Sequence, residues 1–175
     1  MLLNKKEKRI NFTMVFVLMI CCISLLVYSS AEKKGWKTYK IGKGSISFPE
    51  NWKGDVDAGV WWPGKENLGM GRPAISVHIG MTPLMMSRTF EDRAKSHMNA
   101  EPKDKKKVTV CGFSGFICTW EFNKHKHMGL YLEEKSGSGM GIMHFIDCQA
   151  PVDVYETHQA DFENIITSFS CIKQI

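Results

Sequence analysis

The sequence lacks the short motifs that mark several common enzyme classes. Its 175 residues contain no Gly-x-Ser-x-Gly, no P-loop and no His-Glu-x-x-His, and none of its six cysteines form a Cys-x-x-Cys pair. Such motifs would indicate a serine hydrolase, a nucleotide hydrolase, a zinc protease or a thioredoxin-type redox centre. We therefore expect neither a catalytic set nor a cofactor, and a protein that works by binding.

The chain also has little excess charge outside its N-terminus. It contains 23 Lys and Arg against 18 Asp and Glu, and four of these basic residues and one acidic residue precede Glu32, which leaves 19 against 17. Nucleic acid binding is therefore not expected. The one basic cluster, Lys103 to Lys107, lies between a helical pattern and a strand pattern, where we predict a solvated loop.

The first 31 residues have the order of an export signal. A basic head is followed by an apolar run over residues 12–28 and by two small residues, Ser29 and Ala31, at the −3 and −1 positions before Glu32. The basic residues of the head are Lys5, Lys6, Lys8 and Arg9. This order predicts a signal peptide that is cleaved before Glu32.

Two other outcomes stay open for this segment. The apolar run can be retained as an N-terminal membrane anchor with its basic end inside. Lipid attachment at Cys21 or Cys22 is the third outcome, although Ile20 is not the small residue that lipoprotein peptidase requires before Cys21. Each outcome places a single domain, residues 36–175 after a polar linker at 32–35, outside the cytoplasm, either in the periplasm or secreted.

Four cysteines follow the signal: Cys111, Cys118, Cys148 and Cys171. An even number in an oxidising compartment favours disulfides. A C-terminal helix that runs back along the preceding strand brings Cys171 to the level of Cys111 and Cys118, and leaves Cys148 near the opposite end. Because bridged Cα atoms lie within about 7 Å, we predict a disulfide from Cys111 or Cys118 to Cys171. One or two free buried thiols are the alternative.

Hydrophobic periodicity predicts an α+β fold, an antiparallel β-sheet meander packed with two helices. Phe90, Ala94 and Met98 recur every fourth residue after a cap at Ser87 or Thr89, which predicts the first helix. The second helix is predicted over 152–169, and residues 53–72 as a loop with at most one short strand. Strands are predicted over 38–41, 45–48, 74–81, 107–111, 116–122, 128–134, 140–147 and 170–172.

The meander pattern also predicts a register. Pairing Trp120 with Leu130 aligns the apolar residues of both strands and leaves a five-residue turn at 123–127. Strand 140–147 is apolar on both faces, so we expect it to be covered on both sides.

Two motifs resemble the PsbP-like domain family. Ile46 to Trp52 (Ile-Ser-Phe-Pro-Glu-Asn-Trp) resembles the opening strand of these domains. Phe162 to Phe169, with its apolar-apolar-x-Ser-Phe ending, resembles their C-terminal helix. The family includes photosystem-associated lumenal proteins and exported bacterial proteins of the DcrB type. The resemblance implies an α/β sandwich with an antiparallel sheet, usually non-enzymatic and often bound to the envelope, and it transfers no catalytic residues.

Trp61 and Trp62 are the leading candidates for a ligand- or partner-binding site. Neighbouring side chains of an extended segment face opposite ways, so the two indoles cannot both enter the same core. We expect the more exposed one to contact a partner, a sugar ring or a lipid. The alternative is that one tryptophan fills the core and the other packs under the loop.

His125 and His127 are weaker candidates for a metal site. Two histidines two residues apart on an extended segment can point the same way and would bind zinc or copper if a third ligand came near. A solvated basic turn is the simpler interpretation. The eleven methionines form no closely repeated cluster, so copper binding has little support.

Cys118 and His144 define a last hypothesis. By the register above, His144 lies beside core residues, where a hydrogen-bonded core histidine is expected. A nucleophilic Cys118–His144 pair is the enzymatic alternative, without an oxyanion motif to support it.

Together these patterns predict an exported, membrane-associated, non-enzymatic module that binds an envelope protein or complex, with contact to the membrane through the N-terminal segment if that is retained. A small-ligand or metal carrier is the alternative. A hydrolytic or redox enzyme around Cys118 and His144 is the minor alternative.

Overall fold

The structure is a computed structural model that describes residues 35–42, 44–64, 73–84, 89–135 and 141–171. The chain divides into two compact units, Met1–Lys34 and Gly35–Ile175, and every described residue belongs to the second. The predicted export signal therefore lies outside the described residues. Within the described ranges, no helix is both long and apolar enough to cross a membrane.

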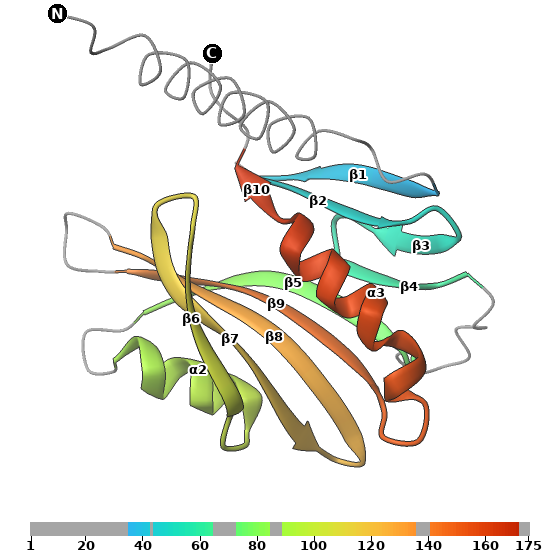
Figure 1. The fold of residues 1–175 in the computed structure, drawn as a ribbon. Helices are drawn as coiled ribbons and strands as arrows, with labels where there is room; N and C mark the ends of the chain where they lie inside the picture. Colours follow the sequence, from blue (N-terminus) through green and yellow to red (C-terminus); the bar gives the residue numbers. More distant parts are fainter. Residues whose placement is uncertain (1–34, 43, 65–72, 85–88, 136–140, 172–175) are drawn as a thin grey trace, which may run out of the picture. The chain divides into compact units, whose positions relative to one another are not determined.

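The described residues of this unit form two antiparallel sheets and two helices (Figure 1). The large sheet has seven strands in the order β3-β4-β5-β9-β8-β7-β6, and the small sheet has three in the order β1-β2-β10. The large-sheet strands are β3 (Trp52–Asp55), β4 (Val60–Pro63), β5 (Ser76–Pro83), β6 (Lys103–Val110), β7 (Phe113–Phe122), β8 (His125–Glu134) and β9 (Ile142–Pro151). The small sheet comprises β1 (Trp36–Ile41), β2 (Gly44–Pro49) and β10 (Ser170–Cys171). The predicted α+β class is confirmed.

Helix α2 (Phe90–Met98) follows directly from its local sequence. The Thr89 hydroxyl accepts a hydrogen bond from the Asp92 N–H at 3.1 Å, and the Asp92 carboxylate accepts one from the Thr89 N–H at 3.4 Å, which together form a capping box. The helix ends at Asn99, whose φ of 51° is left-handed. Its buried residues are the predicted every-fourth-residue stripe.

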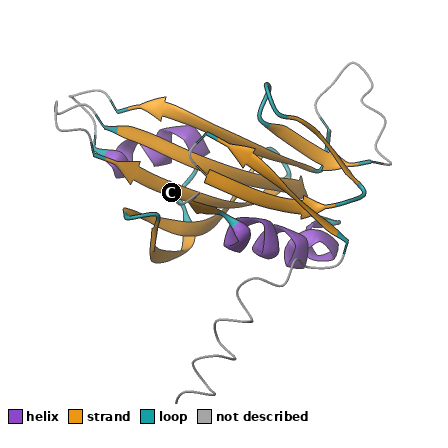
Figure 2. Cartoon of the chain, turned by 90° about the horizontal axis from the view of Figure 1, so that it is seen from above, coloured by secondary structure: helices purple, strands orange, loops and turns teal. Residues whose placement is uncertain are grey.

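Helix α3 (Tyr155–Ser168) packs against β8 and β9 of the large sheet and against β2 of the small sheet. Figure 1 shows α3 between the two sheets, and α2 on the opposite side of the large sheet. In the view from above (Figure 2), the strands of the large sheet lie side by side. We call the two sides of the large sheet the α3 face and the α2 face.

The core has one cluster on each face. Ile46 and Phe48 of β2 join Leu130, Ile146 and Phe162 in the larger cluster, on the α3 face. The smaller cluster, on the α2 face, consists of Leu84, Phe90, Ala94, Met98, Phe116, Cys118, Trp120, Tyr131 and Met143. Strand β9 contributes to both clusters, which confirms that it is covered on both sides.

The predicted register of the meander is wrong by three residues. Trp120 pairs with His127, and Leu130 pairs with Ile117. The turn contains two residues, Asn123 and Lys124, both with positive φ (49° and 63°), in place of the five predicted. Because three is an odd number, the error also exchanges the faces: Trp120 lies on the α2 face and Leu130 on the α3 face.

Two segments predicted as loops contain strands that were not expected, and residues 65–72 of the loop predicted over 53–72 lie outside the described residues. Residues 52–63 form the β3–β4 hairpin, in which Trp52 pairs with Pro63 and Asp55 with Val60. The lysine cluster belongs to β6, the last strand of the large sheet, although its side chains are exposed as predicted. In both segments sheet pairing outweighs the low strand propensity of Gly, Pro, Asp and Lys.

Candidate functional site

The most polar part of the α2 face lies past the C-terminal end of α2. Ser76 of β5 pairs with Gln149 of β9, which pairs with His127 of β8, so these side chains form a row across three strands. Two residues further along β5 and β9, His78 pairs with Asp147 on the same face. We call the group Ser76, His78, His97, His127, Asp147 and Gln149 the histidine face.

Hydrogen bonds connect the members of this group in the β-strands. Gln149 Nε2 donates to Ser76 Oγ at 3.0 Å, and Ser76 Oγ lies 3.0 Å from His78 Nε2. His127 Nδ1 lies 3.0 Å from Asp147 Oδ1, with 8% and 13% of the two side chains exposed. Polar groups this buried require partners, and these side chains find them within β5 and across neighbouring strands. The face is therefore held in one geometry by the sheet beneath it.

Aromatic rings position two of the histidines. The His127 imidazole stacks on Trp120 with ring centroids 4.7 Å apart. Trp120 can lie flat there because its neighbour on β8 is Gly129, where a Cβ atom would come within 2.8 Å of the indole. His97, at the end of α2, has its ring 4.1 Å from Phe145.

His97, near the end of α2, also contacts the sheet through Tyr131. Its Nδ1 lies 3.1 Å from the Tyr131 hydroxyl. Desolvation against the sheet lowers the pKa of His97, and the charges of Arg93 and His127 lower it further, while Asp147 opposes the shift. The Asp147 carboxylate that opposes the shift is the one that lies beside His127.

The two candidate tryptophans face opposite ways, as the sequence predicted for adjacent residues. Trp61 is fully buried on the α3 face, where its ring stacks on Phe48 with centroids 4.7 Å apart. It lies against Gly54, where a Cβ atom would come within 2.1 Å of the indole nitrogen. Trp61 is therefore a core residue and cannot contact a partner in this conformation.

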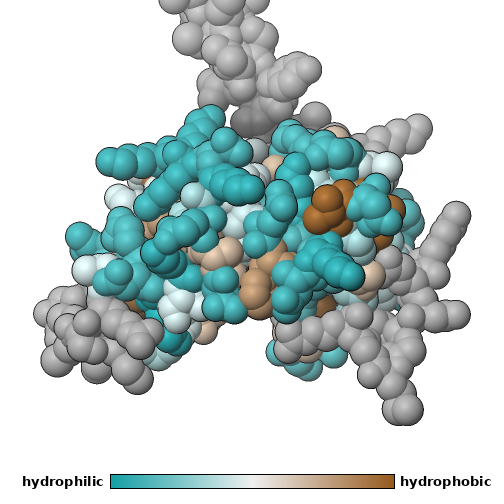
Figure 3. Space-filling view, turned by 90° about the horizontal axis from the view of Figure 1, so that it is seen from below, coloured by the Kyte–Doolittle hydropathy of each residue, from teal (hydrophilic) through white to brown (hydrophobic). Residues whose placement is uncertain are grey.

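Trp62 lies on the α2 face and is half-buried. It shares that face with Val60, two residues away on β4, and Val60 pairs with His78. Trp62 thus belongs beside the histidine face, at the β4 end of the row. Figure 3 shows this side of the domain, which presents mostly hydrophilic side chains and one small, strongly hydrophobic patch.

His125 and His127 lie in strand β8, not in a turn. Their ring centroids are 6.5 Å apart, and His125 Nδ1 lies 3.0 Å from the carbonyl oxygen of Asn123. In the described part of the chain, no three His, Cys, Asp or Glu side chains lie close enough together to hold a metal ion.

The Cys118–His144 hypothesis is wrong because the two residues lie on opposite faces of the large sheet. Cys118 is buried on the α2 face, with its Sγ 3.6 Å from the Met98 sulfur. His144 pairs with Leu132, so it lies on the α3 face. It is half-exposed, with Nε2 2.7 Å from Glu134 Oε2.

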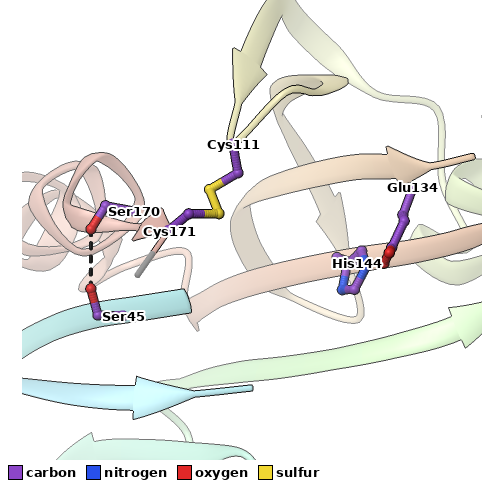
Figure 4. The surroundings of a disulfide bond; sticks show 6 residues. All are labelled: Ser45, Cys111, Glu134, His144, Ser170 and Cys171. Carbon is purple, nitrogen blue, oxygen red and sulfur yellow. Dashed lines mark hydrogen bonds and ion pairs between the residues drawn. A yellow bond between two sulfur atoms is a disulfide. The ribbon is translucent and has the colours of Figure 1, made fainter. Parts of the chain in front are cut away.

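The predicted disulfide forms between Cys111 and Cys171, whose Cα atoms are 5.5 Å apart (Figure 4). It joins the tip of the β6–β7 hairpin to β10. Beside it, the Ser170 and Ser45 hydroxyls lie 3.0 Å apart, between β10 and β2. Cys118 and Cys148 are free and buried, as the alternative for two of the thiols predicted.

The sequence analysis missed most of the histidine face, although a signal was present. Ser76 and His78 alternate with apolar residues in β5, and Asp147 and Gln149 do so in β9. Such alternation shows that one side of each strand is polar. It does not show that the two strands are neighbours, since Ser76 and Gln149 are 73 positions apart in the sequence.

The architecture is that of the PsbP-like class of α+β domains. The structure of the cyanobacterial PsbP protein (CyanoP) from Synechocystis sp. PCC 6803 matches with a TM-score of 0.50 and 12% identity, over 82% of this chain and 96% of that one. LpqN of Mycobacterium tuberculosis, a protein involved in cell envelope biogenesis, matches with a TM-score of 0.52 and 11% identity, over 77% of this chain and 89% of that one.

These similarities establish the fold. No protein-family model matches the sequence, and no curated protein matches it either. The resemblance to exported bacterial proteins of the DcrB type stays a prediction.

Proposed function

We propose that this chain is an extracytoplasmic, non-enzymatic module that binds a protein or complex of the cell envelope. The observation that carries the proposal is the Cys111–Cys171 disulfide. Structural disulfides persist in oxidising compartments and are rare in the cytosol. The N-terminal sequence, with its basic head and apolar run, supports the same location independently.

The fold supports an envelope role. LpqN, whose fold is similar to that of this chain, is involved in cell envelope biogenesis. At this level of identity the similarity extends to the fold alone, so the envelope role of this chain is part of the proposal.

The side-chain arrangement favours binding over catalysis. Cys118 and His144 are separated by the sheet, and the buried Cys118 thiol has a pKa raised to about 12 by desolvation. Ser76 contacts His78, but its side chain is fully buried and offers no accessible nucleophile. What remains accessible is Trp62 beside a rigid set of hydrogen-bonding groups, which suits recognition of a partner surface.

Fractionation with intact-mass measurement tests the location. We expect the protein in the membrane or in the extracytoplasmic fraction, with Cys111 and Cys171 bridged. A mass that begins at Glu32 identifies the released form, and the uncleaved mass in the membrane identifies the anchored form. A cytosolic protein with four free thiols after residue 31 would contradict the proposal.

A further inference from the structure

Strand β6 forms one edge of the large sheet and carries a dense group of lysines. Lys103, Lys105, Lys106 and Lys107 occupy four of its first five positions, and all four are exposed. We call this group the lysine edge. In a domain whose basic and acidic residues are otherwise nearly balanced, it is a local concentration of positive charge.

These lysines lie on both sides of the sheet, and a bulge interrupts the strand among them. Lys103 pairs with Thr119 and Lys106 with Ile117, so β6 has one extra residue between them, and Asp104 there has a φ of 50°. The Lys105 ammonium lies 4.0 Å from the centroid of the Phe116 ring, on the α2 face.

Lys107 pairs with Phe116 and so shares the α2 face with Lys105, whereas Lys106 pairs with Ile117, whose side chain packs against the core of the α3 face. The lysine side chains therefore lie on both the α2 face and the α3 face of the sheet.

Neighbouring carboxylates neutralise this edge only in part. Lys103 Nζ lies 3.6 Å from Glu121 Oε1, and the Asp104 carboxylate accepts a hydrogen bond from Thr119 Oγ1 at 3.1 Å. Within the described ranges, neither Lys106 nor Lys107 lies within ion-pair distance of a carboxylate. The edge therefore keeps a net positive charge that an anionic surface can complement.

We propose that the lysine edge binds the anionic phospholipid headgroups of a membrane. The inference rests on the proposed extracytoplasmic location, because a retained apolar segment at residues 12–28 would hold the domain at a lipid surface. Flexible ammonium groups reach headgroup phosphates, and each lysine adds a small, salt-sensitive attraction.

A partner strand fits this edge less well than a lipid surface does. A bulge and a row of lysines are the features that keep an edge strand from pairing with another chain. An added strand would need the regular ladder that the bulge at Asp104 interrupts. Contact with headgroups needs no ladder and tolerates ammonium groups on both faces.

Lysine footprinting tests the inference on the full chain. The protein is reconstituted into vesicles of phosphatidylcholine, with or without phosphatidylglycerol, and acetylation of each lysine is measured by mass spectrometry. We expect Lys106 and Lys107 to react about threefold more slowly with phosphatidylglycerol present, and this protection to disappear in about 0.5 M NaCl. Lys53, exposed on β3, and Lys124, exposed in the β7–β8 turn, should react equally in both vesicles.

A matched pair of variants locates the effect. K106Q/K107Q should lose the protection that Lys103 and Lys105 show with phosphatidylglycerol, whereas K53Q/K124Q should keep it. Equal reactivity in both kinds of vesicle would overturn the inference, as would protection by a soluble acidic peptide in place of lipid. So would self-association of K106Q/K107Q without a change in the lipid footprint, because the lysines would then only guard the strand edge.

The vesicle experiment involves neither cellular location nor an envelope partner. Its failure therefore leaves the proposed function intact, and a cytosolic location in the fractionation experiment would refute that function whatever the footprint shows.

Discussion

Cys111 and Cys171 are separated by 60 residues in the sequence, and their disulfide ties the tip of the β6–β7 hairpin to the last strand of the small sheet. Strand β10 has two residues and pairs with Ser45 and Gly44 of β2. So short a strand contributes little by itself. The bridge therefore holds the end of α3 and the small sheet against the large sheet.

Removal of this bridge should destabilise the domain. A closed loop of this length corresponds to about 4 kcal/mol of chain entropy in the unfolded state. The C111S/C171S variant should lose about that much free energy of unfolding in a urea titration, and the reduced wild-type protein should match it. A loss below about 1 kcal/mol would show that the connection is not what secures the small sheet.

The two free thiols should be unreactive in the folded protein. Desolvation raises the pKa of Cys118 to about 12 and raises the pKa of Cys148 well above its ordinary value. Since the thiolate is the reacting species, iodoacetamide at pH 8 should label neither cysteine until the protein is unfolded, when both should react. Rapid labelling of Cys118 in the native state would contradict this, and would reopen a role for that residue in chemistry.

Trp61 and Trp62 should respond oppositely to truncation. Trp61→Ala should cost about 3–5 kcal/mol of folding free energy, because its fully buried ring stacks on Phe48. Trp62→Ala should cost about 1 kcal/mol or less, as a partly exposed residue, but should weaken capture of the partner. Urea titration of both variants provides the comparison, and equal losses would show that Trp62 is structural.

The domain should lose stability in mild acid through His97. Desolvation lowers its pKa below the ordinary value of 6.5, so the unfolded chain binds the proton more readily. The free energy of unfolding should therefore be unaffected by this group above about pH 6.5, and should fall as the pH drops from there toward the folded-state pKa.

The His97→Gln variant should have a flatter acid limb, since Gln retains a group able to hydrogen-bond to Tyr131. Urea titrations between about pH 7.5 and pH 5 provide the measurement. Identical pH dependence in the wild type and His97→Gln would exclude His97 as the cause.

Local signals predicted the helices and the fold class well. The capping box at Thr89 and the apolar residues that follow it at every fourth position lie within one short segment. Helix α2 could therefore be predicted without knowledge of its neighbours in the fold. The disulfide prediction also succeeded in choosing Cys171 and excluding Cys148. It left Cys111 and Cys118 open, because both could reach the end of the final helix.

Strand pairing was harder to predict. Asn123 and Lys124 form a two-residue turn with both residues at positive φ, a conformation for which Asn-Gly is the usual sequence signal. Without that signal a longer turn was expected, and the register moved by three. The β3–β4 hairpin was not predicted because glycine usually indicates a loop. Gly54 is instead a strand residue whose missing side chain makes room for the Trp61 ring.

The histidine face depends on contacts that are remote in the sequence. His78 lies beside Asp147, and Ser76 beside Gln149, only because β5 pairs with β9, a strand much later in the sequence. Periodicity identifies the polar side of each strand. It does not identify the partner strand, because α2 and three other strands lie between β5 and β9 in the sequence.

Site-specific photo-crosslinking in intact cells tests the central claim, that Trp62 and the histidine face bind an envelope partner. A benzoylphenylalanine residue is placed at position 62, and for comparison at Trp36, which is also half-buried but lies on β1. The account predicts one discrete adduct with an envelope protein from position 62, lost when His78 is also replaced by Ala, and no such adduct from position 36. The same adducts from both positions, or none from position 62 in protein that retains its Cys111–Cys171 disulfide, would contradict it.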